Sequence, residues 1–234
     1  MIRVDPSNRH QAFASEARPT TDELPPERTE MTTNKTRGFS LIELMVTLMI
    51  FLVAAAILGM GIQPALKESR VTAAYNTTLG VLRQARDTAI GERQTYYVTF
   101  SNAAVPNTVS ITQGATGTII STYTLPTDVS YNVLPKFPTS QTVFPMTPDA
   151  FGIGGTAIDF DQGVAAGVKN VIYFLPDGSA QDANGNINNG VIYVVRQADY
   201  YSAKALTVWG ATGRLRGWRM DQQPVTTTYY WRQQ

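Results

Sequence analysis

An apolar run of 24 residues, 39–62, constrains this chain more than any other feature of its sequence. As a helix that rises about 1.5 Å per residue, the run would be about 36 Å long, which is enough to cross the hydrocarbon core of a bilayer. Lys35 and Arg37 precede it, so its N-terminal side is expected to stay cytoplasmic. The run holds a single charge, Glu43, and a lone carboxylate is costly in lipid unless a partner offsets it.

The residues around the start of this run, Gly38-Phe39-Ser40-Leu41-Ile42-Glu43, resemble the class III signal of type IV pilins and pseudopilins. The resemblance implies that prepilin peptidase cuts between Gly38 and Phe39 and methylates the new amine of Phe39. The apolar helix would then anchor the subunit in the inner membrane and later pack in the core of a filament. There Glu43 would pair with the N-terminal amine of a neighbouring subunit, since opposite charges attract strongly at low dielectric constant. The alternative is a plain single-pass anchor in which the glutamate occurs by chance.

Residues 1–38 are expected to be a leader that is removed. Residues 1–30 are rich in Pro, Arg, Asp and Glu and poor in large apolar side chains, so they are expected to be disordered. A start at Met31 would give the short basic leader Met-Thr-Thr-Asn-Lys-Thr-Arg-Gly, which is typical of the resembled family. Residues 1–30 are therefore interpreted as either an extended leader or the product of a misassigned start codon.

The composition argues against enzyme chemistry. The chain has no Cys, and its only His, His10, lies in the expected leader. A mature protein with neither imidazole nor thiol cannot use Ser-His-Asp or Cys-His catalysis and lacks the usual zinc ligands. Neither an enzymatic activity nor a metal or other cofactor is expected.

The residues after the apolar run predict an amphipathic helix. Apolar side chains recur at three- and four-residue steps through 65–92, the pattern of a helix with one buried face. Pro64 is expected to kink the helix or to end its first section, because proline removes a backbone hydrogen bond. Gly91 is expected near the end of the helix. The predicted parts are a leader (1–38), a transmembrane half-helix (39–63), an amphipathic stem (64–93) and a β-rich head (94–234).

From Tyr96 onward the pattern changes to a period of two, which is typical of strands. The candidate strands are 95–101, 107–113, 117–125, 129–134, 156–161, 170–175, 190–197 and 204–220. The segment 135–155 is interpreted as a loop that connects two parts of the sheet, and the tail either adds an edge strand or stays mobile. The predicted fold class is α+β: a pilin-like lollipop in which a long N-terminal helix packs on an antiparallel β-sheet head.

Two motifs of the head are similar to those of the GspH/FimT group of pilin-like proteins. Residues 170–179, Asn-Val-Ile-Tyr-Phe-Leu-Pro-Asp-Gly-Ser, resemble a strand and an F-x-P-D-G-S turn of that group. Residues 205–216, Ala-Leu-Thr-Val-Trp-Gly-Ala-Thr-Gly-Arg-Leu-Arg, resemble its closing hairpin, which ends in G-R-x-R. The order of one helix followed by strands agrees with this resemblance.

Gly213, Arg214 and Arg216 form the G-R-x-R segment, which in some members of this family is associated with DNA binding for uptake. Strand alternation places Arg214 and Arg216 on one face, and Arg219 lies shortly beyond them. Guanidinium groups bind phosphates without regard to sequence and in a salt-sensitive way. The alternative is that these arginines pair with carboxylates of the head or of a neighbouring subunit.

Two acidic features complete the candidates. Residues 182–190 place oxygen-bearing side chains at alternate positions, as a calcium loop does, but Ile187 stands where such a loop has glycine and Tyr193 where it has a bidentate glutamate. Asn and Gly at this density are also ordinary turn residues. Asp159 and Asp161 fall on one face of a strand and, without a partner for acid–base chemistry, are expected to be solvated.

The sequence thus predicts a minor pilin or pseudopilin of a type IV pilus or a type II secretion pseudopilus. Its expected partners are prepilin peptidase, other pilin subunits and the inner membrane, which it crosses once with the head in the periplasm. Its expected work is structural, at the initiation or the tip of the filament. The alternative is a DNA-binding minor pilin that uses Arg214, Arg216 and Arg219.

Overall fold

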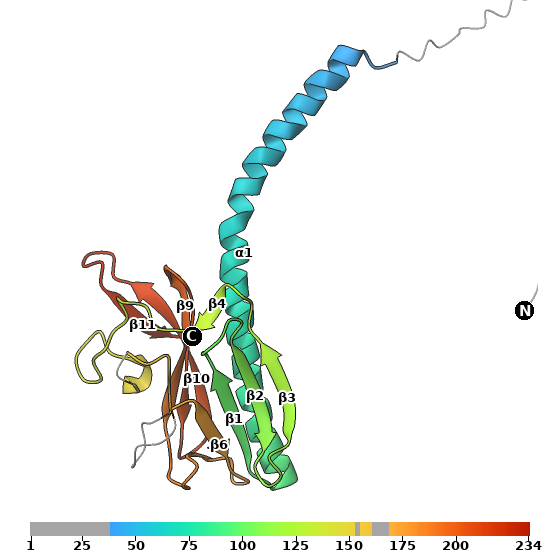
Figure 1. Ribbon diagram of the computed structural model, residues 1–234. Helices are drawn as coiled ribbons and strands as arrows, with labels where there is room; N and C mark the ends of the chain where they lie inside the picture. Colours follow the sequence, from blue (N-terminus) through green and yellow to red (C-terminus); the bar gives the residue numbers. More distant parts are fainter. Residues whose placement is uncertain (1–37, 153–154, 161–168) are drawn as a thin grey trace, which may run out of the picture. The chain divides into compact units, whose positions relative to one another are not determined.

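The computed structural model describes residues 38–152, 155–160 and 169–234, and for residues 58–64 it describes the backbone alone (Figure 1). The expected leader, apart from Gly38, and Asp161 lie outside these residues. The chain divides into two compact units, Met1–Met49 and Ile50–Gln234. The elements in chain order are α1 (Leu41–Glu92), β1 (Tyr96–Ser101), β2 (Thr108–Gln113), β3 (Ile119–Thr124), β4 (Val129–Tyr131), η1 (Pro148–Ala150), β5 (Ile158–Asp159), β6 (Val171–Phe174), β7 (Ala180–Gln181), β8 (Gly190–Arg196), β9 (Asp199–Trp209), β10 (Arg214–Gln222) and β11 (Tyr229–Gln233).

Helix α1 continues through Pro64, so this proline does not end the first section of the helix. The helix ends one residue beyond Gly91, where Arg93 adopts a left-handed φ of 54° and the amide of Gln94 bonds back to the carbonyl of Ala89. Helices commonly end with one left-handed residue. Among the described residues, no helix is both long enough and apolar enough to cross a membrane. The transmembrane half predicted for 39–63 includes residues 58–63, whose side chains lie outside the described part, and it stays a prediction.

The second part of α1 buries one stripe of side chains on the sheets, as its periodicity predicts. Val71, Ala74, Thr78, Leu82 and Ala85 follow one another at three- and four-residue steps and are buried. Full burial of a side chain the size of Val71 or Leu82 contributes about 1.5–3 kcal/mol. Ile90, which the pattern assigns to the same stripe, is 41% exposed, whereas its neighbour Ala89 is buried.

The strands form two antiparallel sheets. The first contains five strands in the order β3-β2-β1-β6-β7. The second contains six strands. Five of them follow the order β11-β10-β9-β8-β4, and β5 also pairs with β8. Residues from both sheets and from α1 share one hydrophobic core, so the helix packs against the head along this part of its length (Figure 1). The predicted class, α+β with a helix packed on antiparallel sheets, is confirmed.

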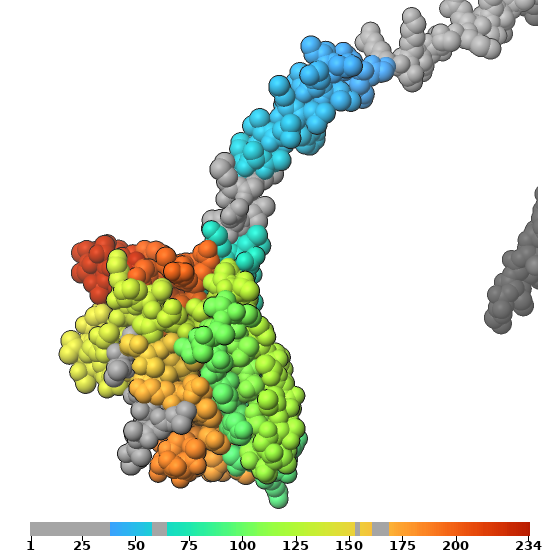
Figure 2. Space-filling view, in the orientation of Figure 1, coloured from blue at the N-terminus to red at the C-terminus, as the bar shows by residue number. Residues whose placement is uncertain are grey.

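Strand β8 of the second sheet is buried on both faces, and the segment 135–155, which connects β4 to β5, covers one of them. Along β8, Ile192 and Val194 pack into the core beneath α1, whereas Val191, Tyr193 and Val195 belong to a second core on the opposite face. Phe137 and Phe151 of this connecting segment belong to that second core. Figure 2 shows the described part of this segment, coloured from yellow-green to yellow, gathered on the opposite side of the head from the green β1–β3.

Most predicted strands are present, and the structure resolves two points at the end of the chain. The candidate strand 204–220 is two strands, β9 and β10, joined by a turn that contains Gly213 with a φ of 59°. The tail takes the first of its two predicted alternatives, because β11 pairs with β10 at the edge of the sheet. The two-residue strand β7 carries no periodic pattern and was not predicted.

Gly217 lets β10 approach the helix. A Cβ atom built at this glycine would lie 1.8 Å from the Oη and 3.1 Å from the Cζ of Tyr75, which is 7% exposed in the core. The backbone of Gly217 can therefore lie against the Tyr75 ring only while position 217 has no side chain.

We expect Gly217→Ala to lower the free energy of unfolding by about 1–3 kcal/mol, the usual effect of overpacking. Tyr75→Phe removes the oxygen that the new methyl group would meet. The double variant should therefore be more stable than the sum of the two single changes predicts. Thermal unfolding followed by circular dichroism measures all three variants, and strict additivity would contradict this packing.

Candidate functional site

The residues of the expected processing signal lie at the beginning of α1. Gly38, Phe39 and Ser40 precede the helix and are exposed. Glu43 is in the first turn, where the positive end of the helix dipole favours a carboxylate. The carbonyl of Ser40 accepts a hydrogen bond from the amide of Leu44 at 3.1 Å, which closes the first turn. The Gly38–Phe39 bond is thus exposed and outside regular structure. The specific roles of Gly38, Phe39 and Glu43 stay predictions.

The three arginines of the candidate DNA-binding segment do not share one surface. Arg214, Arg216 and Arg219 all belong to β10, but each lines a different cavity. The structure therefore does not bring them together as a single basic patch, and each has surroundings of its own.

Arg216 forms an ion pair within the head, the alternative considered from the sequence. Its Nη1 lies 2.6 Å from Oδ1 of Asp149, whose side chain is 4% exposed. The other carboxylate oxygen accepts hydrogen bonds from the hydroxyl of Thr207 and, at 3.0 Å, from Nε1 of Trp209. The guanidinium also lies over the Trp209 ring, 5.2 Å from its centre. Charge-assisted hydrogen bonds are stronger than neutral ones, so these contacts hold Arg216 in place.

Sequence reasoning missed Asp149, the partner of Arg216. The two residues are 67 positions apart, and Asp149 lies in the turn η1 within the segment interpreted as a connection. Asp149 and Ala150 have φ angles of 52° and 59°, in the left-handed region that residues other than glycine seldom adopt. No local pattern of the sequence signals this contact, because it depends on how the segment folds back over β9 and β10.

Arg219 lies at the edge of a mixed-charge hollow. It is directly opposite Lys204 in the pairing of β10 with β9, and Glu68, Asp221 and Arg232 line the same hollow. Burial lowers the pKa of Lys204, the charge of Glu68 acts in the opposite direction, and Arg219 lowers the pKa further. Both signs of charge are interleaved here, so this hollow is a poor phosphate site.

Arg214 has different neighbours, which come from the last turns of α1. Arg83, Arg86 and Arg214 line one hollow of about 400 Å³ together with a single acid, Asp87. Arg86 also donates hydrogen bonds to the carbonyls of Gly178 (3.2 Å) and Thr212 (3.1 Å). It therefore joins the turns of the two motifs that resemble the GspH/FimT group.

The contact between these turns explains Gly213. A Cβ atom built there would lie 2.1 Å from the carbonyl oxygen of Gly178 and 2.7 Å from Nε of Arg86. In the facing turn, Asp177 accepts hydrogen bonds from the hydroxyl and the amide of Ser179, and these lower the pKa of its carboxyl. The two glycine-containing turns and Arg86 thus form one unit at the end of the head where α1 ends.

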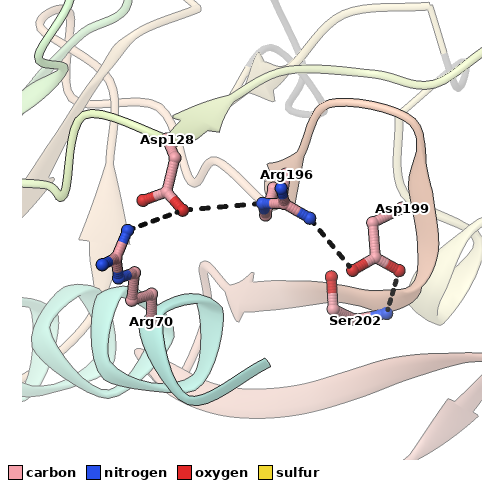
Figure 3. Close-up of polar contacts among 5 residues, drawn as sticks. All are labelled: Arg70, Asp128, Arg196, Asp199 and Ser202. Carbon is pink, nitrogen blue, oxygen red and sulfur yellow. Dashed lines mark hydrogen bonds and ion pairs between the residues drawn. The ribbon is translucent and has the colours of Figure 1, made fainter. Parts of the chain in front are cut away.

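A chain of ion pairs joins the stem to the β8–β9 hairpin, and sequence reasoning did not find it. Asp128 Oδ2 lies 3.2 Å from Nη1 of Arg70 and 3.5 Å from Nε of Arg196 (Figure 3). Arg196 Nη1 is 3.9 Å from Asp199, which accepts a hydrogen bond from the amide of Ser202 (Figure 3). These side chains are partly exposed, so each pair contributes about 1 kcal/mol or less.

The calcium-loop candidate uses its first carboxylate for its own turn. Oδ1 of Asp182 accepts the amides of Asn184 and Asn186, and Oδ2 accepts the Asn186 side chain. Burial alone would raise the pKa of Asp182, but the bonds from Asn186 and Asn184 outweigh it and lower the pKa. Within the described residues, no three His, Cys, Asp or Glu side chains gather as a metal site would require.

Asp159, expected to be solvated, is 1% exposed, so that expectation was wrong.

Comparisons with known proteins found one match to the N-terminal residues and one to the fold. The family model described as the prokaryotic N-terminal methylation motif matches residues 33–59, a small part of the chain that includes the expected cleavage site. No curated protein matches the sequence. Among solved structures, the chain is similar to the type IV minor pilin FimU of Pseudomonas aeruginosa, with a TM-score of 0.38 and 12% identity over 66% of this chain and 89% of that one.

We expect Arg216→Ala to lower the free energy of unfolding by about 2 kcal/mol, because it leaves the buried carboxylate of Asp149 without its cation. Arg214→Ala, an equal loss of charge at an exposed position of the same strand, should change it by less than about 0.5 kcal/mol. Denaturant unfolding of both variants measures the difference. Equal effects would show that the ion pair does not support the fold.

Proposed function

We propose that this type IV pilin-like protein is a minor subunit of a type IV pilus or of a type II secretion pseudopilus. Prepilin peptidase cuts it between Gly38 and Phe39 and methylates Phe39. The apolar helix holds the subunit in the inner membrane with the head in the periplasm, and it later joins the filament at its initiation or tip. The observation that carries this proposal is the methylation motif, 33–59, which overlaps the beginning of the long helix α1.

The surface of the first part of α1 supports an assembly role. The large apolar side chains of residues 39–57 are exposed, from Phe39 at 81% to Ile57 at 63%. A contiguous apolar surface of this kind marks a membrane or protein contact. A bilayer covers it before assembly, and the helices of neighbouring subunits cover it afterwards.

Glu43 is the one charged side chain of residues 39–57 and sets the position of the subunit. In an apolar filament core its carboxylate is costly alone but is stabilised by a neighbouring subunit's N-terminal ammonium group. Cleavage before Phe39 creates that ammonium group. The role we propose for the whole chain is accordingly structural, through packing and one ion pair.

We expect Glu43→Ala to be processed normally but not to enter filaments, because the ion pair with the neighbouring subunit is lost. Immunoblots of sheared filaments and of membranes from the producing cells measure incorporation, and mass spectrometry measures processing. Glu68→Ala removes a similar exposed carboxylate from the same helix and should assemble normally. Gly38→Leu should stay uncut. Normal incorporation of Glu43→Ala would contradict the pairing.

DNA binding for uptake is the second candidate function, and one observation favours it in a revised form. Arg83, Arg86 and Arg214 converge on one hollow with a single acid beside them. Arg216 is instead bound to Asp149, and Arg219 belongs to the mixed-charge hollow. The phosphate contacts of this alternative are therefore Arg214 with the two arginines of α1.

We expect the double change Arg83→Ala/Arg214→Ala to weaken binding of duplex DNA if this alternative holds. Loss of two phosphate contacts should reduce the slope of log K against log salt by about 1.8. Gel-shift titrations of the full-length protein in detergent at several salt concentrations measure this slope. Lys136→Ala/Lys169→Ala removes the same charge at other exposed positions and should leave the slope unchanged. No binding by the unaltered protein, or equal slopes for the two double variants, would exclude this candidate.

A further inference from the structure

The head has two ends along α1, and its contacts show which residues lie at each. At one end, Arg86 bonds to the carbonyl of Thr212, in the turn between β9 and β10. At the other end, Glu68 lines a hollow together with Tyr201, near the beginning of β9, and Asp221, near the end of β10. The turn between β10 and β11 follows directly, so it belongs to this second end, which we call the Glu68 end of the head.

The Glu68 end of the head lies close to the apolar run along the helix. Ile62, the last residue of the run, and Glu68 belong to the same helix and to the same compact unit, Ile50–Gln234. The six residues between these positions rise about 9 Å along a helix, and the head-group layer of a bilayer is about 5–8 Å thick on each side. When the run occupies the hydrocarbon, as in the proposed function on which this inference rests, the Glu68 end begins at the lipid head groups.

The surface of this end is apolar and aromatic where the β10–β11 turn meets the segment of Val143 and Phe144. Val225 in the turn is 93% exposed, and Val143 and Phe144 are exposed as well. Val143 and Phe144 line one hollow of about 400 Å³ with the end of the turn and with Tyr229, at the beginning of β11. The ring of Tyr201, which is 64% exposed, lies 6.0 Å from the Tyr229 ring between their centres. These side chains therefore form one continuous surface.

A lysine accompanies the tyrosines of this surface. Nζ of Lys136 lies 5.7 Å from the centre of the Tyr200 ring and 5.8 Å from that of the Tyr229 ring. Tyrosine is enriched at membrane interfaces, because its ring can lie in apolar surroundings while its hydroxyl stays among the head groups. The stem of a lysine also lies on apolar surface while its ammonium group meets lipid phosphates. No acidic side chain lines the hollow that Lys136 shares with Val143.

We propose that this end of the head docks on the surface of the membrane in which α1 is anchored. The docking surface consists of Lys136, Val143, Phe144, Tyr201, Val225 and Tyr229. Its apolar side chains enter the boundary between head groups and acyl chains, and its tyrosines and lysine lie among the phosphates. The short helical distance from the apolar run favours lipid as the occupant, because the bilayer is within reach of this surface without a second protein. The subunit then leaves the membrane only when filament contacts replace the lipid around both the run and the head.

The test uses single-cysteine variants, which can each carry one fluorescent label because the chain has no cysteine of its own. The full-length protein is reconstituted in vesicles of phosphatidylethanolamine and phosphatidylglycerol that contain lipids with a quenching spin label. A label at Thr226→Cys, in the β10–β11 turn, should lose emission about twofold to a quencher on the head groups. A label at Ala115→Cys should keep its emission, because the β2–β3 turn bonds to Thr95, just beyond the end of α1. Equal quenching at the two positions, or none at Thr226→Cys, would overturn the proposal.

A third label, at Ile57→Cys in the exposed apolar run, separates docking of the head from anchoring of the helix. A quencher on the acyl chains should reduce its emission. Quenching at position 57 without quenching at position 226 would overturn the docking proposal alone, whereas the reverse would contradict the anchoring alone. An emission change at position 226 that grows with the protein-to-lipid ratio, without quenching by lipid, would assign the surface to a second copy of the chain and also overturn the proposal.

Two double variants test the surface itself. Val143→Asp/Val225→Asp places carboxylates against anionic phosphatidylglycerol and should reduce the quenching of the Thr226→Cys label about twofold. Ile119→Asp/Ile120→Asp changes two exposed apolar side chains of β3, which follow the Ala115 turn, and should leave that quenching unchanged. All four positions are exposed, so the melting temperature should stay the same in both variants. Equal effects of the two double variants on the quenching would overturn the proposal.

Discussion

Burial of one stripe of α1 between two sheets is the constraint on which the rest of the head depends. Leu82 and its neighbours along the helix are in contact with both sheets through a single core, so neither sheet can be placed without the helix. The close approach of Gly217 to Tyr75 and the hydrogen bond between Thr78 and Tyr131 (2.9 Å) fix the depth at which the helix lies. The apolar side chains of residues 39–57, in the earlier part of α1, are instead exposed. One continuous helix thus carries both the buried stripe of the head and the exposed apolar surface on which the proposed assembly role rests.

Asp149 has a comparable influence on the opposite face of the second sheet. Its carboxylate ties the returning segment to β9 through Thr207 and Trp209 and to β10 through Arg216. Because of this ion pair, Arg216 is held in place beside the tryptophans and is not free to contact a phosphate. The same segment supplies Phe137 and Phe151 to the second core, so the ion pair and the apolar burial stabilise one arrangement. The segment 135–155, although rich in proline and glycine, is part of the folded head because its side chains pack on one face of the second sheet.

Much of the fold was predictable because its signals are local. The three- and four-residue periodicity of the stem follows from the helical repeat, and the alternation of β1, β2 and β6 follows from the pleat of a strand. The two head motifs identified Gly178 and Gly213 from the sequence. The structure explains why position 213 is glycine, because Gly178 and Arg86 lie too close for a side chain there. The missed features are contacts between distant residues: Asp149 with Arg216, Arg70 with Asp128, and the gathering of three tryptophans from three strands.

The sequence by itself determined the apolar run, its single carboxylate, the methylation motif at its start and the amphipathic stem after it, because each is a pattern of neighbouring residues. Only the tertiary structure decided which arginine of the G-R-x-R segment can meet a ligand. Arg214 and Arg216 are two residues apart on one strand, yet one lies beside the end of α1 and the other is bound by an acid 67 positions earlier. A side chain's charge is written in the sequence, but its availability depends on which distant partner the fold brings to it.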